Sequence, residues 1–435
     1  MLKNKSDYKI SNKLYVWLVL CIFLNFILLL AACQATTLTQ TLDQQPVTPA
    51  DQLNFSNDEA PIDSITIVDS NKSNDEITNS GLNPELSTDL AGEALGESIP
   101  KHEVTLVFIG DVMMDSFIAD YIRDYGVDYP WTDVAEILQQ GDLAIANLET
   151  SVSTRGATKK PAGFGFRSAP STLQGLQNSG IDLVTLANNH VKDFGDEAFY
   201  DTLEHLTNYQ IGYVGAGTTL NEAEELKTFE VNGLKLGFLA YTAIIPWQGW
   251  QATADSPGVA PLVIDQYDEL LANIKQAKES TDILTVILHW GTEYQDTPNQ
   301  WQIDLAHQII DNGADIIVGH HPHILQGIEF YQGKPIFYSI GNFVFLKKDD
   351  NAGKTGIFEL VIDKNGFKSG VIHPVYIQYT KANLLDSENV LNKEIINNLS
   401  KLSEVLGTEV TSTGEFSPLA GRKFNLLSLP GVPIE

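Results

Sequence analysis

Cysteine is nearly absent from this sequence of 435 residues. The chain has two cysteines, Cys21 and Cys33, so no thiol follows residue 33. This excludes a disulfide scaffold, a thiolate metal site and a cysteine nucleophile from any folded region beyond that point. A metal site in such a region would use oxygen and imidazole donors.

Positive charge is also scarce. The 27 Lys and Arg residues stand against 56 Asp and Glu residues, which gives a net charge of −29. A chain this acidic repels nucleic acid, so we expect no nucleic-acid partner. Segment 34–100 is especially one-sided, because Lys72 is its only basic residue and its aromatic residues are few. Such a segment cannot bury enough apolar surface to fold, and we predict a disordered acidic linker over 34–100.

Residues 1–33 have the pattern of an export signal. Four lysines precede an apolar run over 14–30, and Ala31, Ala32 and Cys33 follow it. Small residues before a cysteine resemble the lipobox of bacterial lipoproteins, which implies lipidation of Cys33 and cleavage just before it. An uncleaved transmembrane anchor is the alternative, because the run is close to the lower limit of about 17–25 residues for a span. Both interpretations place the rest of the chain outside the cytoplasmic membrane and attached to its surface.

Beyond residue 101, short apolar runs alternate with amphipathic segments, which is typical of α/β folds. We predict one α/β domain over 101–380, with several strands within Lys354–Tyr379. A C-terminal helix and tail are predicted over 381–435, with the helix at Asn389–Leu406. Other helices are predicted at Trp131–Gln140, Leu173–Asn178, Asp196–Asn208 and Gln300–Asp311. Strands are predicted at Val104–Ile109, Leu143–Ala146, Leu183–Leu186, Leu234–Tyr241, Ile283–Leu288, Ile316–Val318 and Ile336–Tyr338.

Polar residues follow nearly every predicted strand. In open α/β sheets, ligands bind outside the carboxyl ends of the strands, where the loops direct side chains toward a shared point. The sequence therefore predicts one convergent polar site. The residues that follow the strands are Asp111, Asn147, Glu149, Asn188, Asn189, His190, His289, His320, His321, His323 and Asn342.

The residue types in this set indicate a metal site. Carboxylate, amide and imidazole donors without thiolate suit Mn, Fe or Zn. The donors outnumber what one tetrahedral ion accepts, which favours two divalent ions about 3.5–4 Å apart. Such a pair activates water against phosphorus and carbonyl centres alike, so the residues alone leave the reaction class open.

The motifs taken together resemble the CapA family of capsule synthesis proteins, and their order and spacing match from about Val104 to Phe345. The resemblance implies a calcineurin-like metallophosphoesterase fold, a β-sandwich flanked by helices with the metals at the strand ends. The motifs are Gly110-Asp111-Val112-Met113, Ala146-Asn147-Leu148-Glu149, Ala187-Asn188-Asn189-His190, Leu288-His289-Trp290-Gly291, His321-Pro322-His323 and Ser339-x-Gly341-Asn342-Phe343.

The resemblance also implies roles for individual residues. His190 is expected to be the catalytic acid beside the metals. Arg167 and Asn147 are expected to bind substrate, although a structural ion pair explains Arg167 equally well. His320 is interpreted as a neighbour of the ligands. The expected metal ligands are Asp111, Glu149, Asn189, His289, His321 and His323.

Two residues depart from the metallophosphoesterase pattern. Met113 stands where that pattern has a histidine two positions after the aspartate, and the second motif ends in Glu149 where an aspartate is usual. The missing imidazole leaves open whether one ion or two bind.

We therefore expect a membrane-tethered, metal-dependent phosphoester hydrolase that acts in synthesis, anchoring or export of an anionic capsule polymer such as poly-γ-glutamate. Its expected partners are the membrane, the polymer and the subunits of a membrane polymer synthase. The alternative is a non-catalytic accessory subunit of that synthase.

Overall fold

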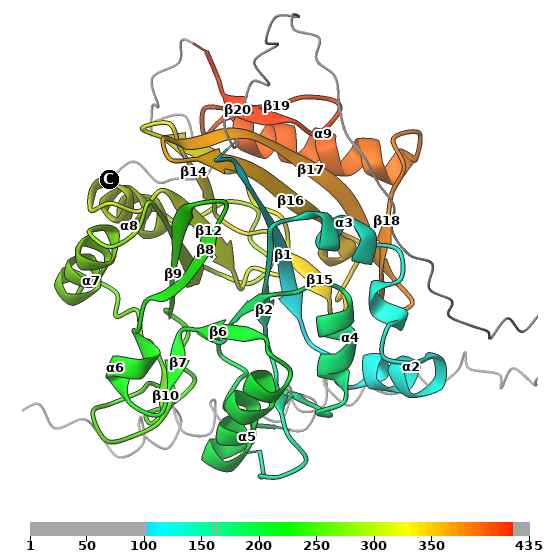
Figure 1. Cartoon of the computed structure of the whole chain (residues 1–435). Helices are drawn as coiled ribbons and strands as arrows, with labels where there is room; N and C mark the ends of the chain where they lie inside the picture. Colours follow the sequence, from blue (N-terminus) through cyan, green and yellow to red (C-terminus); the bar gives the residue numbers. More distant parts are fainter. Residues whose placement is uncertain (1–101, 159, 162–163, 421–435) are drawn as a thin grey trace, which may run out of the picture. The chain divides into compact units, whose positions relative to one another are not determined.

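The computed structural model describes residues 102–158, 160, 161 and 164–420 (Figure 1). The predictions for the signal segment 1–33, for Cys33 and for the linker 34–100 therefore lie outside the described residues. Among the residues that are described, none of the helices combines the length and the apolar character that a membrane span requires.

Two β-sheets form the domain. The larger sheet has the order β18-β17-β16-β1-β2-β5-β6, and β15 pairs with the end of β1. Strands β1, β2, β5, β6 and β15 run parallel, whereas β16, β17 and β18 are antiparallel to their neighbours. The bounds are β1 Val104–Val112, β2 Leu143–Leu148, β5 Leu183–Thr185, β6 Gly212–Val214, β15 Asn342–Val344, β16 Lys354–Asp363, β17 Gly366–Gln378 and β18 Lys381–Leu384.

The smaller sheet has the order β13-β14-β12-β11-β9-β8. Its four central strands, β14, β12, β11 and β9, are parallel, and the two edge strands are antiparallel to them. Parallel neighbours require crossover connections, and helices supply most of them. The bounds are β8 Lys227–Val231, β9 Leu234–Thr242, β11 Ile283–His289, β12 Ile316–His320, β13 Ile328–Tyr331 and β14 Lys334–Phe337.

The two sheets pack face to face around a shared apolar core. In β1, Leu106 and Phe108 enter that core, where they join Phe238 of β9 and Ile287 of β11. The residue between them, Val107, faces the opposite side of its sheet and joins a second cluster. This alternation follows from the two-residue period of a strand, and it buries both faces of the central strands.

Helices cover the outer face of each sheet. Leu173 of α4 and Phe199 of α5 pack on the larger sheet, while Ile274 of α7 and Ile309 of α8 pack on the smaller one. The helices are α2 Phe117–Tyr125, α3 Ala135–Gln140, α4 Thr172–Asn178, α5 Gly195–Asn208, α6 Leu220–Ala223, α7 Asp268–Lys278, α8 Gln300–Asp311 and α9 Val390–Glu404. Short elements between them are η1 Tyr129–Trp131, β3 Ser151–Val152, β4 Arg167–Ser168, β7 Ala216–Gly217, β10 Gly258–Val259 and η2 Asn351–Gly353.

The last described segment packs on the same domain. The strand β18 extends the larger sheet at its edge, and α9 lies along β17 together with the hairpin of β19 (Thr408–Val410) and β20 (Phe416–Pro418), as Figure 1 shows. The helix begins at Asn389, whose side chain accepts a hydrogen bond from the backbone N–H of Leu391. Such a cap satisfies one of the free donors at a helix start.

The predicted α/β class, with a β-sandwich flanked by helices, is confirmed. All seven individually predicted strands are present, and α8 has the predicted bounds. The predicted helix Trp131–Gln140 is wrong in part, because Trp131 ends the short helix η1 and α3 begins only at Ala135. The helices α2 and α7 were not among the predicted elements.

Candidate metal centre

The carboxyl ends of the parallel strands meet at one edge of the domain. In the larger sheet, Asp111 of β1 lies level with Asn147 of β2 and with Asn342 of β15. In the smaller sheet, His289 of β11 lies level with His320 of β12. All five side chains are almost fully buried, with at most 2% of their surface exposed.

Asp111 of the larger sheet makes polar contacts with side chains of the smaller sheet and of the loop after β12. Its Oδ1 accepts a hydrogen bond from Asn147 Nδ2 at 2.8 Å and lies 3.0 Å from His320 Nδ1. Its Oδ2 lies 3.1 Å from His323 Nδ1, and the same nitrogen lies 2.9 Å from Asn342 Oδ1. The convergence predicted for strand ends is therefore present around this carboxylate.

Glycine permits the close approach of β15 to β1. A Cβ atom on Gly110 would lie 2.0 Å from the carbonyl oxygen of Gly341, far inside van der Waals contact. That oxygen accepts a hydrogen bond from the Asp111 backbone N–H at 3.0 Å. Gly341 itself has φ 71°, a backbone conformation that costs glycine little. These two glycines bring Asn342 alongside Asp111.

Asn147 contacts three of the six predicted ligands. Its Nδ2 lies within 3.4 Å of Glu149 Oε2 and of His289 Nδ1, in addition to its bond to Asp111. Its Oδ1 accepts a hydrogen bond from Asn188 Nδ2 at 3.0 Å. The predicted substrate contact of Asn147 stays a prediction, and the geometry assigns the side chain a bridging position among the acidic and imidazole groups.

The second group of predicted ligands lies beside the first. His289 Nε2 is 2.8 Å from Asn189 Oδ1 and 3.6 Å from Glu149 Oε1. His190 Nε2 is 3.8 Å from the same oxygen of Glu149. Glu149 therefore faces two imidazoles.

The position of His190 depends on Asp193 and Lys160. His190 Nδ1 lies 2.7 Å from Asp193 Oδ2, and the other oxygen of Asp193 lies 2.6 Å from Lys160 Nζ. Lys160 also donates to the backbone carbonyl of Asn189 at 2.8 Å. The imidazole packs against the tilted ring of Phe166, with ring centroids 4.5 Å apart. Two polar contacts and one aromatic contact thus orient Nε2 toward Glu149.

The loop after β12 supplies three histidines. His320 ends the strand, and His321 and His323 both have positive φ, 96° and 60°. Residues other than glycine rarely adopt such values, and when they do the strain is often found at functional sites. The rings of His321 and His289 lie 4.9 Å apart. The histidine pair predicted from His321-Pro322-His323 is thus brought to the strand ends of both sheets.

Burial and neighbouring charges shift the acidic pKa values in opposite directions. Burial favours a higher pKa for Asp111, but the hydrogen bonds and charges of His320 and His323 outweigh it, so the pKa lies well below its ordinary value. Burial, together with the charge of Asp111, raises the pKa of Glu149 well above its ordinary value. Two buried carboxylates this close cannot easily be ionised together without added positive charge.

The histidine pKa values are likewise shifted in opposite directions. Burial, assisted by the neighbouring His323, lowers the pKa of His321 to about 3, and burial lowers the pKa of His289 well below its ordinary value. Burial also opposes the charged form of His323, but Glu149 and Asp111 outweigh it and raise the pKa to about 9. Metal ligation requires neutral imidazole, which His289 and His321 offer at neutral pH.

The donor set fits divalent metal ions. Two groups have ligand atoms that all lie within 4.8 Å of one another, namely Asp111, Glu149 and His323, and Glu293, His321 and His323. Glu149 Oε1 and His321 Nδ1 are buried without a hydrogen-bond partner in the described part of the chain. Buried polar atoms normally have a hydrogen-bond partner. A divalent ion bound among these oxygen and nitrogen ligands would supply the partner that the two atoms lack.

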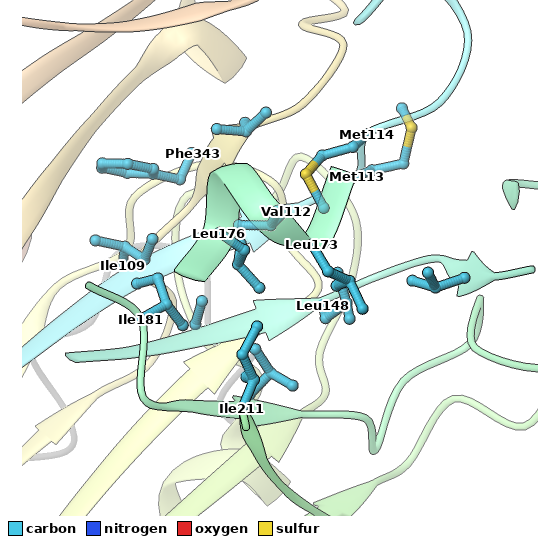
Figure 2. Close-up of a cluster of buried hydrophobic side chains, with 14 of the residues drawn as sticks. Ile109, Val112, Met113, Met114, Leu148, Leu173, Leu176, Ile181, Ile211 and Phe343 are labelled. Carbon is cyan, nitrogen blue, oxygen red and sulfur yellow. The ribbon is translucent and has the colours of Figure 1, made fainter. Parts of the chain in front are cut away.

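Met113 does not contribute to this cluster. Its side chain is fully buried in the apolar layer between the larger sheet and its helices, together with Met114, Leu148 and Leu173 (Figure 2). Its sulfur accepts a hydrogen bond from the Asp115 backbone N–H at 3.2 Å. The position at which the metallophosphoesterase pattern has a histidine is thus part of the hydrophobic core.

Arg167 has its own partners. Its guanidinium donates to the carbonyl oxygens of Arg155 and Gly156 at 2.9 and 3.2 Å and lies 4.3 Å from the ring centre of Phe194. Within residues 102–158, 160, 161 and 164–420, no hydrogen bond, ion pair or ring contact joins its guanidinium to the imidazole cluster. Its predicted substrate contact stays a prediction.

His320, interpreted as a neighbour of the ligands, contacts Asp111 as expected of a neighbour. Sequence reasoning missed two members of the site. Glu293 was not singled out, although it follows His289 by four positions in the same loop. Lys160 has no signal in the sequence, because its position beside Asp193 and His190 results from the fold of its loop.

Comparison with known proteins identifies the family. Residues 105–347 match the model of the family described as bacterial capsule synthesis protein PGA_cap, which is more than half of the chain. The chain belongs to this family. The resemblance predicted from the motifs is thereby confirmed.

Curated relatives agree with this assignment. The chain is 31% identical over 296 residues to the "PGA biosynthesis protein CapA" of Bacillus subtilis, covering 68% of this chain and 77% of that protein. It is also 31% identical over 283 residues to the "Capsule biosynthesis protein CapA" of Bacillus anthracis, covering 63% and 68%. A "Probable polyglutamine synthesis accessory protein" of Mycobacterium tuberculosis is 32% identical over 239 residues, covering 52% and 61%.

A solved structure, the NAD nucleotidase of Haemophilus influenzae, is more distant. It is 14% identical, covers 69% of this chain and 62% of its own, and superposes with a TM-score of 0.39. Similarity at this level supports no inference about the site.

Proposed function

We propose that this protein acts in the synthesis, anchoring or export of an anionic capsule polymer of the poly-γ-glutamate kind, as a metal-dependent phosphoester hydrolase. The proposal rests on the buried cluster at the strand ends, which consists of Asp111, Glu149, His289, His321 and His323. Two potential metal-binding atoms in it, Glu149 Oε1 and His321 Nδ1, have no hydrogen-bond partner within the described residues. Family membership supports the polymer, because two relatives are named for PGA or capsule biosynthesis.

In this proposal, Asp111, Glu149 and His323 would hold one ion, and His321 and Glu293 would lie at a second position. Bound divalent ions supply Lewis acidity and a water of lowered pKa. Asn189 and His289 add an amide oxygen and an imidazole beside Glu149.

His190 then handles the proton. Its Nδ1–H donates to Asp193, which fixes the ring and leaves Nε2 facing the cluster. To protonate the leaving oxygen of a phosphate ester, His190 would be the imidazolium, with its second proton on Nε2. Burial lowers the pKa of His190, while the Asp193 carboxylate favours the charged form. Lys160 holds Asp193 in place through their ion pair. The ring of Phe166, tilted against the imidazole, restricts water on that side.

The membrane tether belongs to the same proposal. A lipid on Cys33 and the acidic linker would hold the domain near the membrane, where a polymer synthase and its product are encountered. The apolar run over 14–30 and the Ala-Ala-Cys sequence support this.

A second candidate is a non-catalytic accessory subunit of the polymer synthase. Met113 favours it, because an apolar side chain in the core replaces a metal-binding imidazole. One relative is also named as an accessory protein. In this case the cluster would bind metal for stability and no ester would be cleaved.

Hydrolysis of p-nitrophenyl phosphate by the full chain in detergent, loaded in turn with Mn, Fe and Zn, distinguishes the two. We expect activity in at least one metal form and a loss of more than about 100-fold in the double variant His321→Ala, His323→Ala, as is usual when a metal or its oriented water is lost. The control is His373→Gln, which removes an imidazole that pairs with Glu359 outside the cluster. Metal-loaded protein without activity, or an undiminished double variant, contradicts the hydrolase proposal.

A further inference from the structure

A polar groove runs along the exposed face of α9. It encloses a cavity of about 550 Å³ between that helix and the start of β16. The opposite face of α9 carries Ile395, Ile396 and Leu399, which pack on the domain. The groove is therefore presented by a helix that the core holds in place. We call it the α9 groove; its polar lining includes Asn351, Lys354, Lys393, Asn397, Asn398 and Lys401.

The spacing of the lining residues gives the groove its length. Val390 and Lys401 mark its two ends on α9, and the residues between them recur at three and four positions, which is one face of a helix. Eleven steps at about 1.5 Å correspond to about 16 Å. An extended chain at about 3.3 Å per residue would place about five residues in it.

The groove is positively charged within a strongly acidic protein. Its lining has three lysines, Lys354, Lys393 and Lys401, and one carboxylate, Glu394. Lys354 pairs with Glu394 at 2.5 Å, which leaves the two other lysines to set the charge. Among the described residues, Lys393 pairs only with Glu388, whose side chain is 89% exposed, and an exposed pair of this kind is weak. Lys401 has no ion pair among the residues that the structure describes.

The amide side chains define the chemistry further. Asn351, Asn397 and Asn398 make no side-chain hydrogen bond within the described residues, so each offers a carbonyl oxygen and an NH₂ group to a ligand. The NH₂ groups and the lysines suit carboxylates, while the carbonyl oxygens need N–H donors. A polyamide with repeated carboxylates carries both groups, whereas a polyphosphate carries no N–H.

The groove is linked to the metal cluster through η2. Asn351 lines the groove, and the carbonyl oxygen of the next residue, Ala352, accepts a hydrogen bond from Asn342 Nδ2 at 3.2 Å. Asn342 Oδ1 is in turn 2.9 Å from His323 Nδ1. One end of the groove is thus two hydrogen bonds from a predicted metal ligand.

We propose that the α9 groove binds a segment of a polyamide chain that bears repeated carboxylates, through Lys393, Lys401 and the three asparagines. That this polyamide is a polyglutamate rests on the proposed function. That the groove suits a polyamide with carboxylates rests only on the lysines and asparagines that line it. The groove would hold the polymer on the domain independently of any reaction at the metal cluster.

Fluorescence anisotropy with a fluorescein-labelled poly-γ-glutamate oligomer tests this on the full chain in detergent, with metal chelated. In the double variant Lys393→Gln, Lys401→Gln we expect about tenfold weaker binding, with the salt dependence reduced. The matched control is Lys364→Gln, Lys368→Gln, which removes the same charge from the β16–β17 hairpin. We expect that control to bind within about twofold of the parent.

Three outcomes would overturn the proposal: no binding by the parent, equal loss in the control, or equally tight binding of labelled polyphosphate. The variant His321→Ala, His323→Ala is expected to bind the oligomer like the parent. If the parent binds the oligomer but its metal-loaded form shows no hydrolysis, the hydrolase proposal is contradicted and the groove proposal stands.

Discussion

The strands β1 and β12 both end at the candidate metal centre, but they deliver different numbers of side chains to it. At the end of β1, Asp111 faces the cluster, whereas Val112, Met113 and Met114 are all in the apolar layer. At the end of β12 and just after it, His320, His321 and His323 all lie at the strand ends.

The backbone explains this difference. Beyond Asp111 the chain stays paired, because Met113 N–H donates to the carbonyl oxygen of Val344 at 2.7 Å and β15 continues alongside. Where a paired strand is covered by helices, the side chains on the covered face are buried. Beyond His320 the chain leaves strand geometry, with positive φ at two histidines. The number of donors at a strand end thus depends on whether the strand pairing continues.

The largest expected loss of stability comes from replacing Asp111, the carboxylate that β1 contributes to the cluster. Asp111→Asn leaves His320 and His323 without their shared carboxylate. Removing one member of a buried ion pair costs about 3–5 kcal/mol, so we expect the free energy of unfolding of the metal-free protein to fall by about that amount. Urea denaturation measures it, and Asp350→Asn at an exposed ion pair is the control, for which we expect a much smaller loss. A loss that small for Asp111 would mean that the contact is not an ion pair.

The variant Met113→His tests whether a histidine at this position becomes a metal ligand or is kept in the core by the backbone. The new imidazole would be buried in an apolar layer without a partner, so we expect a loss of about 2–4 kcal/mol in stability. Metal content, measured by mass spectrometry, should not rise. Met113→Leu keeps the volume and should cost less than about 1.5 kcal/mol. If Met113→His gained an ion at unchanged stability, the side chain would have to leave the core, and the comparison would fail.

The two histidines after β12 should respond to pH in opposite ways when metal is removed. The pKa of His323 is raised to about 9, so its contribution to stability is present below pH 6.5 and is lost as pH rises through 9. The pKa of His321 is lowered to about 3, so stability is lost as pH falls from 6.5 toward 3.

Each of these changes should be on the order of 2 kcal/mol. Denaturation curves across pH should show that His323→Gln flattens the alkaline decline and His321→Gln the acidic one. Glu149 has a raised pKa and acts against His321 in the acidic range, which is why the single variants are needed. The assignment is wrong if both variants flatten the same side.

The smallest expected effect is a change in metal affinity at Glu293, at the exposed edge of the cluster. Glu293 is exposed and joins His321 and His323 in the second group of donors. Since exposed charges are partly screened, Glu293→Gln should weaken binding of one ion by about tenfold and leave the other unchanged. Titration with Mn by calorimetry separates the two ions. A loss of both would show that the two positions are not independent.

The sequence was sufficient for the strands that are buried on both faces. The runs at 104–109, 234–241 and 283–288 are apolar because helices cover one side and the second sheet covers the other, and no surface helix has that pattern. The helix α7 was harder to predict, because its apolar stripe of Leu270, Ile274 and Ala277 is interrupted by polar residues on both sides.

The predictability of the site follows the same division. Residues immediately after a buried strand, such as Asp111 and His289, could be placed because parallel strands end together. Lys160 could not be placed, since its loop between β3 and β4 contains no periodic pattern and its partners are about thirty positions away. The burial of Met113 also depends on packing with Leu173 and Leu148, which a local motif does not reveal.

The strand β1 comes first in the described chain, but it pairs with strands that come near the end. Val104 lies opposite Ile362, and Asp111 lies opposite Asn342. Contacts of this sequence separation slow folding, because a long loop must close before they form. A nascent chain therefore cannot assemble the cluster around Asp111 until residue 342 has left the ribosome. Until then, the edge of β1 that pairs with β15 and β16 stays open, and an open apolar edge exposes the chain to aggregation while it is being made.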